Sequence, residues 1–497
     1  MYWANFLHIY QPRSQQPDIL EQVVLQSYRP LIENTLKHAG ARYTLNINGS
    51  LLELFDKYGY HDLIEGLAEA GRQGKIEFTG SAKYHALLPF LSPREMRRQI
   101  DINNETLKRY LGDAYKPRGF FLPEMAYSPE VAPVIAEAGF EWVILDEIAY
   151  NGKTGAVDYT KLYQIEGTDL RVFFRERRMS NLIMSAVVRD VEQLEKAMAD
   201  ELASKRYVVT GMDGETFGHH RPGLENLLFE IFDTPELNLV QISELAEHYK
   251  TVEKVSPISS TWASSERDIS EGIQFISWKD PRNDIHKLQW KLRDFTLAEF
   301  YKLAADDPEW PRSRAQMDSA LASDQFFWAS AKPWWSIEMI EEGAAALLDI
   351  LQHLPGIHPD RFAEGELYYH QILAMAFDWK RSGKILAIEQ KQQSSLRIPF
   401  KERTLEAGGA ETAVYHAFID MMKQQETEAA ARRDYEAAVL WRDAVYKIEH
   451  KTDIYEAIHA VDLLRIKLTN DYVEKMIDKY KTAYNNIRGG QPEQRGA

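Results

Sequence analysis

Two short segments of the chain hold residues that could do chemistry together. Residues 119–122 and 207–212 are apolar runs rich in aromatic or β-branched side chains, and carboxylates follow both: Glu124 after the first, Asp213 and Glu215 after the second. Such runs are typical of buried strands about to leave a sheet. Carboxylates at two strand ends can converge on one pocket, and a carboxyl pair is the minimal equipment for cleaving a glycosidic bond. Residue types alone leave a structural role for each carboxylate, as a helix cap or an arginine partner, equally open.

The elements that would position these carboxylates alternate along the first half of the chain. Helical stretches, such as residues 92–111 and 129–138, separate most of the predicted strands, and Pro93 and Pro129 suit the first turns of these two helices. The alternation predicts a parallel sheet with right-handed crossovers. Seven or eight strands in this length favour a barrel, whose chemistry lies at the C-terminal strand ends. The predicted strands are residues 2–9, 43–47, 76–79, 119–122, 142–145, 170–174, 207–212 and 239–241.

The pattern changes near residue 251. Residues 256–284 are typical of a loop, and long helical segments follow at 286–304, 314–329, 335–353 and 362–380. Residues 395–410 predict a linker, residues 412–484 predict nearly continuous helix, and residues 488–497 predict a disordered polar tail. The expected fold class is therefore α/β, a distorted (β/α)7-type barrel followed by an α-helical C-terminal region. The expected domains are a catalytic barrel over residues 1–250, a helical domain over 251–395 that completes the active-site cleft, and a C-terminal helical region over 396–497.

Composition excludes several classes of function. The 497 residues are 44% hydrophobic and 27% charged, as in ordinary globular proteins, and the formal net charge is −16. This charge disfavours partners with anionic surfaces, both nucleic acid and membrane. With no cysteine, the chain has no disulfide, thiol nucleophile or thiolate metal ligand. Neither a leader pattern nor a membrane-spanning apolar run is present, so a cytoplasmic location is expected.

The two carboxylate segments also resemble a known family. Leu122-Pro123-Glu124 and the run Asp213-Gly214-Glu215-Thr216-Phe217-Gly218-His219 are similar to the two catalytic regions of glycoside hydrolase family 57. That family contains retaining enzymes that act on α-glucans: amylases, 4-α-glucanotransferases and branching enzymes. The resemblance implies that Glu124 is the nucleophile and Asp213 the general acid/base, and that Glu215 and His219 shape the site.

Weaker similarities follow in the family's order. His8-Ile9-Tyr10-Gln11-Pro12 resembles the family's His-x-His-Gln-Pro, with Tyr10 in place of the second histidine. Residues 74–80, followed by Tyr84-His85, resemble a second region, and residues 322–328, which include Asp324, resemble a fifth. Residues 262–270 are similar to the amylase branch. The resemblance implies sugar contacts by His8, Gln11, His85 and Asp324, and the Tyr10 substitution puts the contact made at that position in doubt.

The implied reaction sets physical requirements. A retaining glycosidase needs its two carboxyls about 5–5.5 Å apart. Glu124 must be ionised to attack, and Asp213 must hold a proton, so we expect the neighbouring charge of Glu124 to raise the pKa of Asp213. The implied substrate is an α-glucan or maltooligosaccharide with α-1,4 linkages. The incoming hydroxyl decides between hydrolysis and transfer, and the residues do not indicate which occurs.

Other residue types give subordinate expectations. Seven of the eleven tryptophans lie in residues 262–335, and we expect Trp278 or Trp328 to touch substrate, although most tryptophans are core residues. His219 and His220 are adjacent, no His-x-x-x-His pair occurs, and we expect no metal and no cofactor.

Residues 432–438, followed by Arg442-Asp443, resemble the helical-hairpin motif of nucleotide-excision-repair subunits and some chaperone-associated proteins, where it mediates protein contacts. This resemblance implies protein contact or self-association through residues 421–450. An ordinary helical hairpin with a charged outer face explains the same residues.

Two alternative functions remain. One is a metal-dependent polysaccharide deacetylase on a related barrel, which normally needs one Asp and two His ligands at a spacing absent from this sequence. Loss of activity with a chelator would favour it. The other is a carbohydrate-binding protein with a relic site, favoured if maltooligosaccharides bind without turnover.

Overall fold

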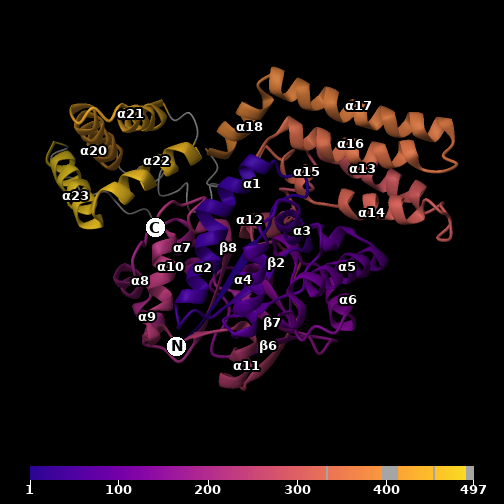
Figure 1. Ribbon diagram of the computed structural model, residues 1–497, viewed down its shortest axis with the longest axis horizontal. Coiled ribbons are helices and arrows are strands. Elements are labelled where there is room, and N and C mark those ends of the chain that lie inside the picture. Colours follow the sequence, from indigo (N-terminus) through magenta and orange to yellow (C-terminus); the bar gives the residue numbers. More distant parts are fainter. Residues whose placement is uncertain (332–333, 394–411, 451–453, 488–497) are drawn as a thin grey trace.

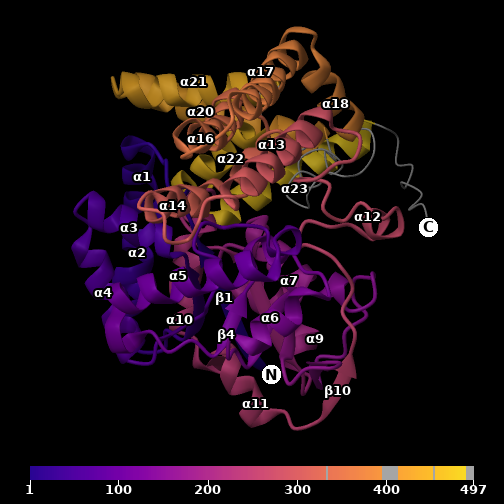
Figure 2. The same ribbon diagram turned by 90° about the vertical axis from the view of Figure 1, so that its right-hand side faces the viewer.

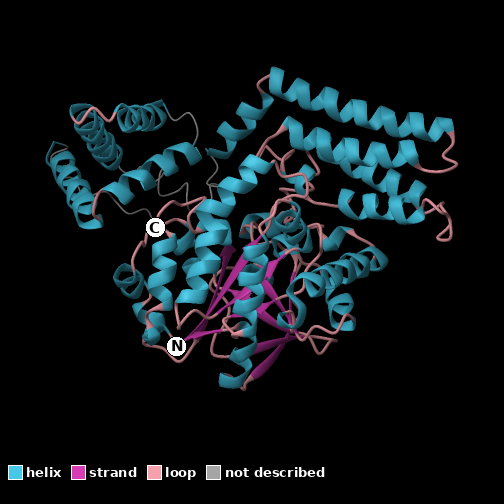
Figure 3. Cartoon of the chain, viewed as in Figure 1, coloured by secondary structure: helices cyan, strands magenta, loops and turns pink. Residues whose placement is uncertain are grey.

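Parallel strands form the centre of the first half of the chain, with helices around them (Figures 1 and 3). The structure is a computed structural model that describes residues 1–331, 334–393, 412–450 and 454–487. The strands are β1 (Tyr2–Ile9), β2 (Tyr43–Ile47), β3 (Ile76–Phe78), β4 (Gly119–Phe121), β5 (Trp142–Asp146), β6 (Leu162–Ile165), β7 (Arg171–Arg175), β8 (Tyr207–Asp213), β9 (Leu239–Val240) and β10 (Val252–Val255).

The strands form two sheets that meet to make a distorted barrel. One sheet has the order β3-β2-β1-β8, with β9 also paired to β1, and the other has the order β10-β6-β7-β5-β4. A parallel bridge between Gly80 and Phe120 joins the β3 and β4 sides. The Glu176 N–H donates to the Val209 carbonyl and joins the β7 and β8 sides. Strands β1, β2, β3, β4, β5, β7 and β8 thus curve round a core, which confirms the predicted fold class.

Two strands were not predicted. β6 runs antiparallel to β7, and β10 pairs with β6. Both are four residues long, β6 is interrupted by the half-buried Gln164 and β10 buries only Val255, so neither gives the strong apolar signal of the central strands. Because β10 ends at Val255, the strands extend past the barrel boundary predicted at residue 250.

Helices of the barrel half pack on the outside of the strands. Ser92 caps α5 by accepting from the Glu95 N–H, as expected for a residue before Pro93. Pro129 is not inside a helix, because α6 begins at Val131. These helices are α1 (Pro17–Val23), α2 (Arg29–Lys37), α3 (Gly49–Lys57), α4 (His61–Arg72), α5 (Pro93–Leu111), α6 (Val131–Glu137), α7 (Arg177–Met184), α8 (Val191–Ala197), α9 (Ala199–Leu202), α10 (Glu225–Phe232) and α11 (Leu245–His248), with a π-helical turn at Val24–Tyr28 between α1 and α2.

The second half of the chain is helical, as predicted, and α13, α14, α16 and α17 lie over one end of the barrel (Figures 1 and 2). The helix predicted at residues 314–329 is instead broken: α14 ends at Ala320 and α15 starts at Asp324. The Ser323 hydroxyl between them donates to the His85 carbonyl at 2.7 Å, a tertiary contact that replaces helix continuation. The helices are α12 (Glu266–Ser270), α13 (Asp284–Phe300), α14 (Trp310–Ala320), α15 (Asp324–Phe327), α16 (Ile337–His353), α17 (Pro359–Arg381) and α18 (Lys384–Gln393).

A C-terminal bundle completes the described chain. Helices α20 and α21 form the predicted hairpin, and the bundle has its own apolar core. The predicted linker at residues 395–410, its domain boundary at 395/396 and the tail at 488–497 lie outside the described residues. No helix of the described chain is long and apolar enough to cross a membrane. The bundle consists of α20 (Thr412–Ala431), α21 (Tyr435–His450), α22 (Ile454–Lys467) and α23 (Asn470–Ile487).

A buried ion cluster fastens this bundle to the barrel. Asp462 on α22 is fully buried and pairs with Arg189 and with Arg221, the latter at 2.7 Å. Gly223 lies against Ile466, where an added Cβ would come within 2.9 Å of the isoleucine side chain. Arg221 and Gly223 belong to the loop that follows Asp213, so the bundle supports that loop from outside.

Candidate active site

Glu124 lies in a strained turn at the C-terminal end of β4. Its φ of 62° and the φ of 46° at Met125 are in the left-handed region, and His85 nearby has a φ of 55°. Such backbone conformations cost about 1–3 kcal/mol each and persist where the surroundings enforce them. Three of the seven non-glycine residues with positive φ in the described chain therefore gather in one place. The turn fixes the direction of the Glu124 side chain.

The Glu124 carboxyl has one hydrogen-bond donor and lies near one histidine. Its Oε2 accepts a hydrogen bond from Trp262 Nε1 at 2.7 Å, and its Oε1 lies 4.0 Å from His85 Nε2. The side chain is 20% exposed, so a ligand can reach it. Burial, and next the charge of Asp213, raise the pKa of Glu124 to about 8, although the Trp262 hydrogen bond acts in the opposite direction. Glu124 and Asp213 are therefore close enough for the charge of Asp213 to act on Glu124, as expected for carboxylates at two strand ends.

Asp213 is the last residue of β8, beside His8 on the paired strand β1. Its charge raises the pKa values of both Glu124 and Glu215, which places three carboxyls within electrostatic reach. Gly214 follows it because an added Cβ would lie only 2.5 Å from Ile9 Cγ2. The 5–5.5 Å carboxyl separation and the raised pKa expected for Asp213 stay predictions.

Glu215 is buried behind this pair and fixes the backbone around it. Its Oε1 accepts from the Tyr28 hydroxyl and from the Tyr10 N–H, the latter at 3.1 Å. Burial and the charge of Asp213 raise its pKa to about 8. Gln11 donates through Nε2 to the Tyr28 hydroxyl at 3.2 Å. Glu215 and Gln11 thus hold the end of β1 against the loop after β8.

The two predicted histidines next to Glu124 are stacked and neutral. The rings of His8 and His85 have centroids 5.1 Å apart. Burial lowers the pKa of His8 to about 4 and that of His85 well below its usual value. His8 Nδ1 is 2.8 Å from Asn46 Oδ1. Neutral imidazoles can either donate or accept a hydrogen bond from a sugar hydroxyl.

The Ser323 contact assigns the tautomer of His85. The single hydroxyl proton of Ser323 goes to the His85 carbonyl, so the 3.2 Å contact between His85 Nδ1 and Ser323 Oγ requires the ring nitrogen to donate. Nε2 is then an acceptor. It is buried, has no hydrogen-bond partner, and faces Glu124 Oε1. A ligand hydroxyl between the two groups would satisfy it.

A hydrogen bond joins Tyr10 to Asp324. The Tyr10 hydroxyl donates to Asp324 Oδ2 at 2.8 Å, so the barrel strand β1 and the helical region both contribute to this contact. Burial raises the pKa of Asp324 to about 6, against the effect of the Tyr10 hydrogen bond. Asp324 is therefore close enough for its charge to act on Glu124, but its carboxylate accepts from the substituted residue, and a sugar contact by Asp324 stays a prediction.

Three other predicted residues lie elsewhere. Trp278 is 1% exposed and packs in a core cluster with Trp290 and Phe326, so the structure places it in the interior instead of on the cleft. Trp328 is half-buried and contacts Trp334. His219 Nδ1 is 2.7 Å from Gln26 Oε1, and burial, and next the charge of His459 on α22, lower the pKa of His219, so this ring lies near the C-terminal bundle.

Several residues that hold the site from the sides were not predicted from the sequence. Trp262 begins the amylase-like segment 262–270, but no role was predicted for it. Arg177 donates to the Trp262 carbonyl at 3.1 Å and to Asp146 at 2.6 Å, and Asp146 also accepts from Arg175. Arg175 in turn donates to the Gly211 carbonyl in β8. The position of Asp146, directly after the apolar run at residues 142–145, was the available signal.

This arrangement can perform substitution at an acetal carbon. One carboxyl with a free oxygen can attack, a second can transfer a proton, and neutral hydrogen-bonding rings line the wall. Among the described residues, no group of three or more His, Asp or Glu side chains could hold a metal ion.

Comparisons with known proteins agree with this geometry. The model of glycosyl hydrolase family 57 matches residues 4–257, just over half of the chain. An alpha-amylase of Pyrococcus horikoshii is 26% identical over 325 residues, with 60% of this chain and 48% of the relative covered. A 4-alpha-glucanotransferase of Thermococcus litoralis is 24% identical over 278 residues, with coverages of 52% and 41%. The chain spans about half the length of these curated relatives.

A solved structure shares the fold. A GH57-type branching enzyme from Pyrococcus horikoshii superposes with a TM-score of 0.56 at 17% identity, covering 74% of this chain and 94% of that chain.

Proposed function

Because the chain belongs to glycosyl hydrolase family 57, we propose that it cleaves α-1,4 linkages of α-glucans through a covalent glycosyl-enzyme intermediate. Glu124 is the nucleophile and Asp213 the general acid/base in this proposal. The observation that carries it is the convergence of these two carboxyls, each at the C-terminal end of a barrel strand, in one site where the charge of Asp213 raises the pKa of Glu124.

The proposed first step forms an ester. Glu124 Oε1, the oxygen not bonded to Trp262, attacks the anomeric carbon while the glycosidic C–O bond breaks. Asp213 gives its proton to the leaving oxygen. Trp262 Nε1 stays bonded to Oε2 and orients the attacking carboxylate.

The second step reverses these roles. Asp213 takes a proton from an incoming hydroxyl, whose oxygen bonds to the anomeric carbon as the ester bond to Glu124 breaks. Water as acceptor gives hydrolysis, and a sugar hydroxyl gives transfer.

Protonation has to be redistributed before attack. Burial and the charge of Asp213 raise the pKa of Glu124 to about 8, so Glu124 holds a proton in the free protein at neutral pH. Glu124 can attack only as a carboxylate, so it must first lose this proton. We propose that the proton passes to Asp213 when a bound sugar brings the glycosidic oxygen beside it, because a hydrogen bond to that oxygen favours the protonated form of Asp213.

The neighbouring residues have supporting roles in this proposal. His8 and His85 bind sugar hydroxyls as neutral imidazoles, Glu215 and Gln11 hold the strand end, and Asp324 lines the cleft. His219 acts indirectly, through the loop that carries Asp213. A cytoplasmic location stays a prediction.

We expect purified protein to convert maltooligosaccharides and amylose, and the products to identify the acceptor. Shorter sugars alone indicate hydrolysis, a ladder of longer sugars indicates disproportionation, and new branch points indicate branching. The Glu124→Gln variant is the matched control, since it keeps the shape of the cleft. Binding without any product over a long incubation would contradict the proposal and favour the non-catalytic alternative.

We also propose self-association through the α20–α21 hairpin. Tyr435, Val439 and Leu440 on α21 are 66%, 43% and 44% exposed, an apolar surface next to the core of the bundle. We expect the sedimentation coefficient to rise with concentration and Val439→Glu to abolish the rise. Val252→Glu, at an equally exposed valine on β10, is the control and should behave as wild type. A concentration-independent monomer would contradict the proposal.

A further inference from the structure

Beside Glu124, the barrel and the helical region meet along a closed line of contacts, which we call the seam. The Arg13 guanidinium donates to Ser319 Oγ at 3.0 Å, Tyr10 bonds Asp324, and His85 exchanges two hydrogen bonds with Ser323. Farther along, Gln99 Nε2 donates to the Asp318 carbonyl at 2.8 Å and Arg98 pairs with Asp318 at the same distance. Residues 318, 319, 323 and 324 are therefore all bonded to the barrel.

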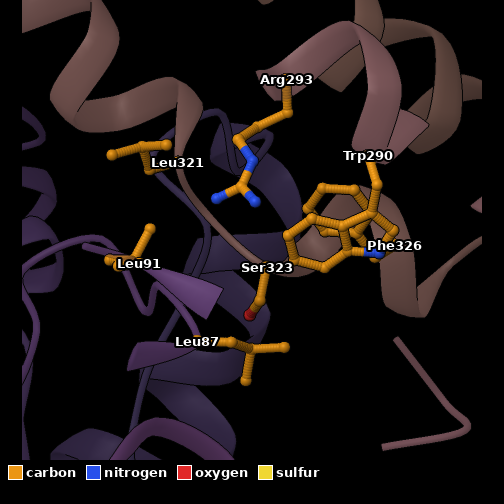
Figure 4. A pocket seen from close by; sticks show the side chains of 7 residues that line it. All are labelled: Leu87, Leu91, Trp290, Arg293, Leu321, Ser323 and Phe326. Atoms are coloured by element: carbon orange, nitrogen blue, oxygen red, sulfur yellow. The ribbon is translucent and has the colours of Figure 1, made fainter. Parts of the chain in front are cut away.

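Apolar packing closes the seam behind the polar contacts. Figure 4 shows Ser323 between Leu87, on the barrel side, and Leu321 and Phe326 of the helical region, with Trp290 stacked on Phe326. The ring centroids of Trp290 and Phe326 are 4.0 Å apart at an interplanar angle of 9°. The cavity at this point has a volume of about 10 Å³, space for no more than a single water.

Tyr10 is the part of the seam that borders the reacting groups. Its ring lies on the ring of His85, with centroids 4.3 Å apart and planes 15° from parallel. Its N–H donates to Glu215 Oε1 at 3.1 Å. The charges of Asp324 and Glu124 both act on its hydroxyl, after burial, to raise its pKa well above the usual value. The backbone N–H, the ring face and the hydroxyl of Tyr10 are thus each held by a neighbouring residue.

We infer that the Tyr10–Asp324 contact closes this side of the site, so that the protein accepts the end of a glucan chain and not its interior. A chain bound through its interior must leave the site in two directions, and the seam leaves no passage on the Tyr10 side. The inference rests on the proposed function, because it specifies which part of an α-glucan the Glu124–Asp213 pair meets.

The residue type at position 10 matters for this closure. The phenol oxygen lies farther from Cα than either nitrogen of a histidine ring, so the histidine found in the family motif cannot make the 2.8 Å contact to Asp324 without movement of the backbone. A Tyr10→His substitution should therefore open the passage while keeping a ring against His85.

A pair of substrates with equal numbers of glucose units tests the inference without any variant. Linear maltoheptaose has two chain ends and β-cyclodextrin has none. We expect wild-type protein to convert the linear sugar and to leave the ring intact. Conversion of both at similar rates would overturn the inference but leave the proposed function standing, whereas failure to convert the linear sugar would contradict the proposed function itself.

Variants at position 10 test whether Tyr10 causes the selectivity for the linear sugar. We expect Tyr10→Ala and Tyr10→His to raise the ratio of cyclic to linear conversion by about ten-fold or more, the scale of selectivity that one pocket contact provides. Tyr10→Phe keeps the ring but loses the hydrogen bond to Asp324, and should raise the ratio by less than Tyr10→Ala does. Arg13→Ala removes an exposed seam contact away from Glu124 and is the matched control. An unchanged ratio in folded Tyr10→Ala protein would overturn the inference.

Discussion

Replacing Glu124 with glutamine is expected to lower kcat on maltooligosaccharides by about 10⁴-fold or more, the scale seen when a covalent nucleophile is removed. An amide cannot form the glycosyl ester, although it keeps the size of the side chain and an oxygen that can accept from Trp262 Nε1. The measurement is the initial rate of product formation, with circular dichroism as the test of folding. Wild-type activity in a folded variant would refute the assignment.

The Glu124→Gln substitution lowers activity but should not lower the stability of the fold at high pH. Burial raises the pKa of Glu124 to about 8, above its value in an unfolded chain, so ionisation opposes folding. The contribution of Glu124 to stability is full below the unfolded pKa and is lost as pH rises through about 8. At pH 8 and above, Glu124→Gln should therefore be at least as stable to urea as wild type. A less stable variant at that pH would show that the charged carboxylate is stabilised in a way that the structure does not contain.

Asp213→Asn separates the two roles. This variant lacks the acid, so ordinary glucans should react as slowly as with Glu124→Gln. A glycosyl fluoride needs no protonation of its leaving group and should still form the ester in Asp213→Asn, but not in Glu124→Gln. If the glycosyl fluoride reacts with Glu124→Gln and not with Asp213→Asn, the assigned roles are reversed.

The second large effect is expected for Trp262→Phe. The indole N–H donates to Glu124 Oε2 at 2.7 Å and lowers the pKa of that carboxyl. Without it, Glu124 holds its proton to higher pH, and one oxygen of the nucleophile loses its orienting donor. We expect kcat/KM to fall by about 10²-fold, as when one preorganised donor is removed from a reacting oxygen.

The pH profile makes this prediction specific. Since kcat/KM reports pKa values of the free protein, the wild-type activity should fall as pH rises through about 8, where Glu124 loses the proton that must pass to Asp213. In Trp262→Phe the same fall should begin at higher pH. Trp278→Phe, at a tryptophan buried in the core, is the control and should not move the alkaline limb. An alkaline limb that stays in place in Trp262→Phe would contradict the role of the indole.

The fold was predictable because its signals are local. The central strands are short runs of buried side chains in a parallel sheet, and such runs stand out against the helices between them. β10 lies at the edge of the second sheet and buries only Val255, and β6 is a run of four residues interrupted by the half-buried Gln164. The break between α14 and α15 depends on Ser323 meeting His85, residues more than 230 positions apart, and no helical pattern contains that information.

The site was predictable only in part, for the same reason. The position of a carboxylate at a strand end is a local feature, which is why Glu124 and Asp213 were identified from the sequence. Partners from distant loops are not local: Trp262 reaches Glu124 across 138 positions, and Tyr10 reaches Asp324 across 314. Trp278 lies in the tryptophan-rich segment 262–335 that was expected to contact substrate, yet its side chain packs in the core.

The formation of an ester on Glu124 is the central claim, and trapping it is the most direct test. Asp213→Asn protein would be mixed with α-maltosyl fluoride, quenched in acid, digested and examined by mass spectrometry. We predict a maltosyl group on the peptide that contains Glu124, and no such group in the double variant that also carries Glu124→Gln. A maltosyl group on another residue, or rapid product formation with no labelled peptide at any quench time, would contradict the account.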